Sequence, residues 1–385
     1  MPEGAHPYRH QREGRRRADL HLLGELSSAT ARTARITHLP FFLALSAIPL
    51  ASLSCDTGTT EAPPGPSVHL LEAELSTSLD AQGYPVTTTT LKPGDKAKDI
   101  VSTTSIRLRF DRFLLPTQTF RQSVCVQSDA RDVKSLDDCV AGVFVEPSYD
   151  PIRRQITLRQ SPDATKTHLA PATTYWVTVY PPPDDTSSGI QAFDGALLEA
   201  PQSFRFTTLD VDPAGSLVEP LPAENFCSPD KGKTPGASDH LKNCATAGCH
   251  INGAGDAANP NDAPEGLDLS DIGPLHDTAI GHVAHETQVG EHASKPENAS
   301  LRFGRSMPII APGDPGNSYL LYKLAASPDN TTTVEESEIA RLRATVVVGM
   351  PMPPSNASKA AFLDEKGLAR LSDWIAAGAP TPVCK

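Results

Sequence analysis

The sequence predicts a multidomain chain in which an antiparallel β-sandwich precedes a mainly α-helical domain. Short stretches that alternate apolar and polar residues, with turn-forming residues between them, fill the region from about 67 to 210. Beyond about residue 225 the strand patterns give way to stretches with helical periodicity. A length of 385 residues suits two domains with terminal segments, and 36 prolines favour linkers and edge strands over long helices.

The first 54 residues resemble an export signal. Several arginines precede a short apolar run, "LPFFLALSAIPLASLSC", that ends at Cys55. The closing "LASLSC" is similar to a lipobox, in which the cysteine is acylated and becomes the mature N-terminus, although Ser52 stands where leucine is usual. An ordinary secretion signal with an incidental Cys55 is the alternative. Residues 55–66, rich in Thr, Pro and Gly, then form a tether.

Residues 67–210 carry the strand patterns of the sandwich. In "SIRLRF" (105–110), the side chains of Ile106, Leu108 and Phe110 alternate with polar neighbours, as in a half-buried strand. Four further stretches are predicted strands, at 141–147, 154–160, 173–181 and 203–210. This half resembles the bacterial Ig-like domains first described in surface-layer proteins, through "TTSIRLRFDRFLLPTQTF", "LAPATTYWVTVYP" and "QSFRFTTLD". The resemblance implies a spacer or adhesion module.

Residues 211–225 form a linker, and residues 226–385 a second domain with two predicted helices. In "LDEKGLARLSDWIAAGAP" (363–380), the apolar residues fall largely on one helical face, and Gly378 with Pro380 ends the helix. "NSYLLYKLAA" (317–326) is a shorter amphipathic helix with Asn317 or Ser318 as its cap.

The stretch "CATAGCH" (244–250) carries the candidate chemistry. A c-type haem is attached by two thioethers from cysteines, and an adjoining histidine ligates the iron. Cys244, Cys249 and His250 supply these groups, with four residues between the cysteines where two are usual. Small residues in the loop leave room for a porphyrin edge.

The second half resembles cytochrome c-like domains of exported bacterial proteins. The ordered motifs are "NCATAGCH", "GLDLS", "IIAPGDPGNSYLLYKL", "GMPMPP" and "LSDWIAAGAP". The resemblance implies one covalent haem c on Cys244 and Cys249, with His250 as proximal and Met352 as distal iron ligand. It also implies that the final helix packs against the haem. Met350, two residues before Met352, is a rival ligand.

Other interpretations of these residues stay open. Zinc binding would need a fourth ligand, and Cys244 with Cys249 could form a disulfide in a haem-free relative. Four further histidines are expected to be exposed loop residues and, with Met307, are minor ligand candidates: His276, His282, His285 and His292.

The other cysteines suggest disulfides, because export leads to an oxidising compartment. Cys125 and Cys139 flank a polar loop that a disulfide would close, and two separate buried thiols are the alternative. If Cys55 carries lipid and Cys244 and Cys249 carry haem, Cys227 and Cys384 remain, and a bridge would join the ends of the second domain. Sequence alone does not establish this connectivity.

These features predict a membrane-tethered haem protein of the cell envelope, periplasmic or attached to the outer membrane, that carries electrons to an unidentified redox protein partner. A net charge of −12 disfavours binding to nucleic acid, and the chain shows no nucleophile elbow, P-loop or dinucleotide fingerprint, so a carrier is expected rather than a catalyst. An open-coordination haem enzyme such as a peroxidase is disfavoured by Met352. The alternative function is a haem-free binding or scaffold lipoprotein.

Overall fold

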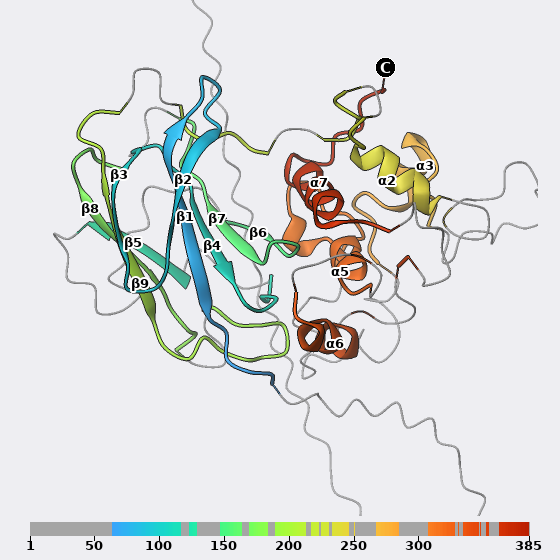
Figure 1. The fold of residues 1–385 in the computed structure, drawn as a ribbon. Coiled ribbons are helices and arrows are strands. Elements are labelled where there is room, and N and C mark those ends of the chain that lie inside the picture. Colours follow the sequence, from blue (N-terminus) through green and yellow to red (C-terminus); the bar gives the residue numbers. More distant parts are fainter. Residues whose placement is uncertain are drawn as a thin grey trace, which may run out of the picture. The chain divides into compact units, whose positions relative to one another are not determined.

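A computed structural model shows two β-sheets and, after them in the chain, a set of short helices, all within the unit that follows Cys55 (Figure 1). It describes residues 64–116, 123–128, 147–163, 169–183, 189–212, 217–222, 225–230, 233–245, 250, 267–284, 307–327, 330, 334–345, 347, 352–353 and 362–384. Within these ranges no helix has the length and apolar character needed to cross a bilayer. The predicted signal, Cys55 and most of the tether lie outside them.

The first sheet has five strands, all paired antiparallel, in the spatial order β2, β1, β4, β7, β6. The strands span Pro85–Leu91 (β2), Leu70–Leu79 (β1), Ile106–Phe110 (β4), Gln155–Leu158 (β7) and Ser148–Asp150 (β6). Buried and half-buried residues alternate along β4, as its sequence predicts.

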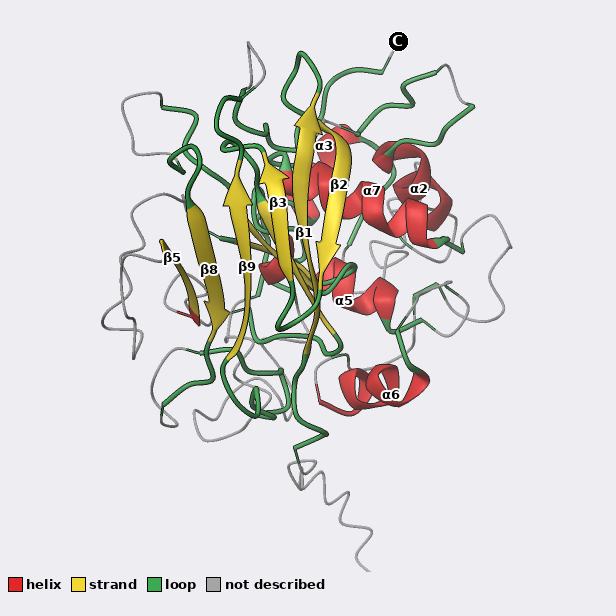
Figure 2. Cartoon of the chain, turned by 60° about the vertical axis from the view of Figure 1, so that its left-hand side comes forward, coloured by secondary structure: helices red, strands yellow, loops and turns green. Residues whose placement is uncertain are grey.

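The second sheet has four strands in the order β3, β9, β8, β5 (Figure 2). They span Lys96–Ile100 (β3), Gln202–Thr208 (β9), Thr174–Val179 (β8) and Val124–Ser128 (β5). The expectation of a wholly antiparallel sandwich is wrong at one edge, because β3 pairs parallel with β9. After the β1–β2 hairpin the chain crosses to the second sheet for β3 and returns with β4, so β3 takes the last strand as its neighbour rather than a hairpin partner.

The strand predictions at 105–110, 154–160, 173–181 and 203–210 are confirmed as β4, β7, β8 and β9. The stretch 141–147 lies almost wholly outside the described residues. The inward side chains of both sheets meet in one apolar core, which includes Leu75, Leu108, Ile156, Val177 and Phe206.

Five α-helices and one 3-10 helix follow the strands among the described residues. They span Ala237–Cys244 (α2), Ile272–Thr278 (α3), Pro315–Asn317 (η4), Tyr319–Ala325 (α5), Glu336–Thr345 (α6) and Glu365–Ala376 (α7). Both predicted helices are confirmed. Ser318 precedes α5 as its N-cap, and α7 ends just before Gly378, whose φ of 98° suits a residue without a side chain.

The terminal helix α7 has a well-defined start and a buried face. The side chain of Asp364 accepts a hydrogen bond from the Gly367 amide at 2.8 Å, which satisfies one of the free N–H groups of the first turn. Leu371, Trp374 and Ile375 are almost fully buried in the helical core. The apolar periodicity of this segment therefore marks the face that packs inward.

The helical core extends into the sandwich half. Phe113, which follows β4, is completely buried among helical residues, with its ring centroid 6.2 Å from those of both Phe193 and Tyr322. The Tyr149 hydroxyl accepts a hydrogen bond from the Leu114 amide at 2.8 Å, and the Tyr149 ring lies against Gly316 of η4. The two halves therefore share a buried contact surface, which we call the seam.

Candidate functional site

Helix α2 places Cys244, the first cysteine of the candidate site, at its last position. The helix starts against the preceding chain, because the amides of Ala237 and Ser238 donate to the carbonyls of Asn225 and Phe226 at 2.7 and 2.9 Å. The Gly236 amide in turn donates to the Asp239 carboxylate at 2.8 Å, which closes the first turn. The direction of α2 is thus fixed at its N-terminal end.

Gly236 allows this close approach. A Cβ atom at Gly236 would lie 2.4 Å from the Phe226 carbonyl oxygen and 2.5 Å from the Cys227 carbonyl carbon, which no real side chain tolerates. The start of α2 and the segment that carries Cys227 are therefore in backbone contact.

A backbone hydrogen bond joins His250 to Cys244. The His250 amide donates to the Cys244 carbonyl at 3.2 Å, and the His250 carbonyl accepts from the Leu269 amide at 2.9 Å. Cys244 is half-buried and packs against the helical core, and His250 is half-buried. The structure thus brings Cys244 and the backbone of His250 together, as a single site requires, while Cys249 lies outside the described residues.

Met352, the predicted distal ligand, is held through its neighbour. The Pro353 carbonyl accepts a hydrogen bond from the Ser327 hydroxyl at 3.2 Å, and Ser327 is buried just beyond the end of α5. The Met352–Pro353 peptide bond is cis, Pro353 is buried and Met352 is half-buried. Met350 lies outside the described residues.

The rival ligands have different surroundings. Met307 is buried in the helical core and its carbonyl accepts from the Ala284 amide at 3.0 Å. The expectation of a loop is wrong for His276, which is exposed on α3, with Nε2 2.8 Å from the Thr381 hydroxyl. His282 is exposed, with Nε2 3.1 Å from the His276 carbonyl, and His285 and His292 lie outside the described residues.

A small hollow of about 200 Å³ lies beside α2, and neither Cys244 nor His250 belongs to its lining. Leu241 of α2 and Leu269, whose amide binds the His250 carbonyl, both line it. Phe226, residues at the start of α3 and the terminal residues Val383 and Cys384 complete the lining. Apolar side chains share the wall with the polar residues Ser238, Lys242, Ser270 and Asp271.

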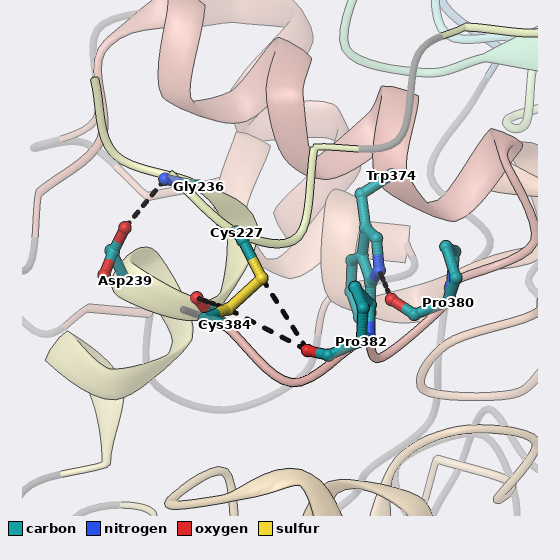
Figure 3. Close-up of a disulfide and its surroundings, with 8 residues drawn as sticks. Cys227, Gly236, Asp239, Trp374, Pro380, Pro382 and Cys384 are labelled. Atoms are coloured by element: carbon teal, nitrogen blue, oxygen red, sulfur yellow. Dashed lines mark hydrogen bonds between the residues drawn. A yellow bond between two sulfur atoms is a disulfide. The ribbon is translucent and has the colours of Figure 1, made fainter. Parts of the chain in front are cut away.

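A disulfide between Cys227 and Cys384 closes the helical half, as predicted (Figure 3). The two Cα atoms are 5.4 Å apart, within the usual range for a disulfide, and the cysteines are separated by 157 residues. The same terminal segment is held by α7, because the Trp374 indole N–H donates to the Pro380 carbonyl at 2.8 Å. Cys125 is also disulfide-bonded, and Cys139, its predicted partner, lies outside the described residues.

The donor set of the candidate site fits a c-type haem. Two thiols on one short loop, an imidazole next to the second thiol and a thioether on a proline-rich segment are the groups that such a haem uses. Among the described residues, no group of three or more His, Cys, Asp or Glu side chains is arranged to hold a bare metal ion. Zinc binding at this loop would also need Cys249, which lies outside the described residues.

Comparison with known families concerns the first half of the chain. Residues 82–208 match the bacterial Ig-like domain. The match runs from just before β2 through β9 and so includes most of the sandwich, which supports the resemblance seen in its strand motifs. A search of the curated proteins found no match to the chain.

Two features of the site have little or no signal in the sequence. Helix α2 is short and has a single large apolar residue, Leu241, so little in its sequence marks it as a helix. Its start at Gly236 with Asp239 three residues later is the one pattern that could have indicated it. The contacts of Leu269 with His250 and of Ser327 with Pro353 join separate parts of the chain, and no local pattern indicates them.

Proposed function

We propose that the protein is an exported c-type haem protein, tethered to a membrane through acylated Cys55, that transfers electrons to a protein partner. Cys244 and Cys249 would hold the haem covalently, and His250 and Met352 would ligate its iron. The haem would supply the one-electron change between ferric and ferrous iron. The match of residues 82–208 to bacterial Ig-like domains, which typically occur in extracellular or surface proteins, supports an exported location.

The backbone contact between His250 and Cys244 is the observation that carries this proposal. Thioether attachment and iron ligation act on one macrocycle, so the residues that provide them must lie on one wall of the site. The hydrogen bond from the His250 amide to the Cys244 carbonyl, at 3.2 Å, holds the backbones of the first cysteine and the histidine together. The Leu269 amide fixes the other side of His250, so that the position of the ligand depends on the helical core rather than on the loop alone.

The remaining groups suit an electron carrier. A methionine thioether opposite a histidine fills the sixth iron position and raises the reduction potential. The anchoring of Pro353 by Ser327 would limit the movement of Met352 between the two oxidation states. A site whose ligands stay in place needs little rearrangement when the electron arrives.

Covalent attachment is tested by expression with a cytochrome c maturation system. The wild-type protein should contain one haem per chain by pyridine haemochrome and by intact mass. Cys244→Ala with Cys249→Ala should abolish attachment, because no thiol remains at the loop. Cys227→Ala with Cys384→Ala is the matched control, since it also removes two cysteines and should keep the haem.

A haem-free envelope binding or scaffold protein is the second candidate. The match to Ig-like domains favours it, since such domains commonly serve as architecture. In this case Cys244 and Cys249 would form a disulfide and the helical half would act as a binding surface. Wild-type protein without added haem mass from a haem-attaching host, with loss of two protons at these cysteines, would establish this candidate and reject the electron carrier.

A further inference from the structure

A buried cluster of charges lies at the seam between the sandwich and helix α6. Arg112, just after β4, donates through Nη2 to the Asp194 carboxylate at 2.6 Å and through Nε to the Glu338 carboxylate at 2.5 Å. Arg341 contributes a second cation, with its Nε 3.1 Å from Glu338. Arg112, Asp194 and Glu338 are at most 3% exposed. Among the described residues, two guanidinium groups therefore face two carboxylates, and this pairing offsets the cost of removing Arg112, Asp194 and Glu338 from water.

Both carboxylate oxygens of Glu338 accept hydrogen bonds from the sandwich half. Oε2 accepts from Arg112, and Oε1 accepts from the Phe113 amide at 2.9 Å. Glu338 lies on α6 and is separated from Arg112 by 226 residues. The first turn of α6 is therefore fixed by two consecutive residues of the Ig-like half.

The tether enters the compact unit at the same cluster. The Gly65 amide donates to the Asp194 carboxylate at 2.9 Å, and the Pro66 carbonyl accepts from Arg112 Nη1. A Cβ atom at Gly65 would lie 2.8 Å from Arg112 Nη2 and 2.9 Å from Arg341 Cδ. Figure 1 shows this start of the described chain, below β1, running toward α6. The tether thus joins the molecule at the seam rather than at a distant end of the sandwich.

Helix α6 is linked in turn to the segment that carries Met352. Arg343 of α6 donates through Nε to the Ala326 carbonyl at 2.6 Å. The next residue, Ser327, donates to the Pro353 carbonyl at 3.2 Å. Ala326 and Ser327 are both buried at the end of α5. Two adjacent residues therefore hold α6 and the residue after Met352.

We propose that Arg112 of the Ig-like half is a positioning residue for Met352. It fixes Glu338 and thereby α6, and α6 shares with Pro353 the anchor at Ala326 and Ser327. The Ig-like half then helps to hold the segment that carries Met352 in place, rather than serving only as a spacer. The part of this inference that concerns iron rests on the proposed function, while the positioning of Met352 does not.

The test compares Arg112→Lys and Glu338→Gln with wild type. Lysine keeps the charge but cannot donate to Asp194, Glu338 and Pro66 in the geometry of the guanidinium fork. In the Glu338→Gln variant the side-chain amide still offers an oxygen to the Phe113 amide but loses the ion pairs with the arginines. Both variants should increase amide exchange about tenfold or more in α6 and in peptides that contain Met352. In haem-loaded protein both should weaken the red charge-transfer band typical of methionine ligation and lower the reduction potential.

Arg109→Lys is the matched control. Arg109 lies on β4, three residues before Arg112, and pairs with Glu72 of β1 at 2.7 Å, entirely within the sandwich. The same substitution there should leave the exchange of α6, the red band and the potential at their wild-type values.

The outcomes separate the two proposals. Unchanged exchange at Met352 in both variants would overturn the positioning role, whether or not haem is attached. Faster exchange with an unchanged red band and potential would also overturn it, because the ligand would then be placed by other contacts. If wild-type protein takes up no haem, the electron-carrier proposal fails, and faster exchange at Met352 still supports Arg112 as its positioning residue.

Discussion

The sandwich and the helical half are stabilised in different ways. In the sandwich, paired strands satisfy their own backbone groups, and side chains from both sheets fill one core. The described α-helices are only 7 to 12 residues long, and helices of this length are marginal in isolation. The helical half therefore depends on tertiary contacts, which include its apolar core, the seam with the sandwich, the Cys227–Cys384 disulfide and the anchored terminal segment.

Two phenylalanines near the end of one strand allow this difference to be tested. Phe110 and Phe113 are both fully buried, but Phe110 lies in the sandwich core and Phe113 in the helical core. Phe113→Ala should lower the free energy of unfolding by about 3–5 kcal/mol, because it leaves a cavity between Phe193 and Tyr322. Chemical denaturation followed by tryptophan fluorescence and by far-UV circular dichroism measures the loss.

Phe110→Ala is the matched control for Phe113→Ala. A similar loss is expected, but amide exchange at the lowest denaturant should rise first in β1 and β4 for Phe110→Ala, and first in α5 and α7 for Phe113→Ala. The same exchange pattern in both variants would show that the two cores unfold together. The sandwich and the helical half would then not differ in how they are stabilised.

The disulfide provides the next largest effect. Cys227→Ala with Cys384→Ala should cost about 2–4 kcal/mol, because the unfolded chain gains freedom when a long loop is no longer closed. Exchange of the Ala237 and Ser238 amides, which bond to the segment beside Cys227, should increase more than that of β1. Thr381→Ala, which removes one exposed hydrogen bond from the same terminal segment, is the control and should change stability little. An equal effect of both changes would mean that the bridge adds no stability.

The two halves also differ in how far the sequence predicts them. Alternation along β4, β8 and β9 is visible because each of these strands buries one face, whereas β7 alternates in sequence although its last three residues are all buried. The final helix is visible because its buried residues recur with helical spacing. Helix α6 is not predicted, since its buried face contains Glu338 beside Ile339 and Leu342, and a buried carboxylate breaks the apolar pattern. Its partner Arg112 is 226 residues away.

For the candidate site, the sequence offers a chemical prediction but no indication of the contacts that support the site. The residue types in "CATAGCH", together with the motifs that follow it and the proline-flanked Met352, predict haem chemistry, which stays a prediction. The parallel β3–β9 pair, the contact of His250 with Leu269 and the anchoring of Pro353 by Ser327 all arise from tertiary contacts. Such contacts depend on how the whole chain packs, so a short sequence pattern does not predict them.

The smallest predicted effect concerns pH and His240 of α2. Its ring lies against Gly367 at the start of α7, where a Cβ atom would be 3.1 Å from His240 Cε1. Burial lowers the pKa of His240, Arg370 lowers it further, and the carboxylates of Asp239 and Asp364 oppose the shift. In the unfolded chain this histidine has a pKa of about 6.5. The unfolded state therefore binds a proton at a pH where the folded state does not, and the folded protein loses stability as the pH falls through and below that value.

His240→Phe should remove this part of the pH dependence. Phenylalanine keeps a ring of similar size against Gly367 but cannot be protonated. The free energy of unfolding of the variant should therefore fall less than that of wild type between pH 7 and pH 5. The difference should be smaller than the effect of Phe113→Ala or of the double cysteine substitution. At pH 8 histidine is neutral in both states, and the two proteins then differ only in packing, which provides the baseline. Denaturation midpoints across this range measure the slope, and identical slopes would show that His240 is protonated as readily in the folded helical half as in the unfolded chain.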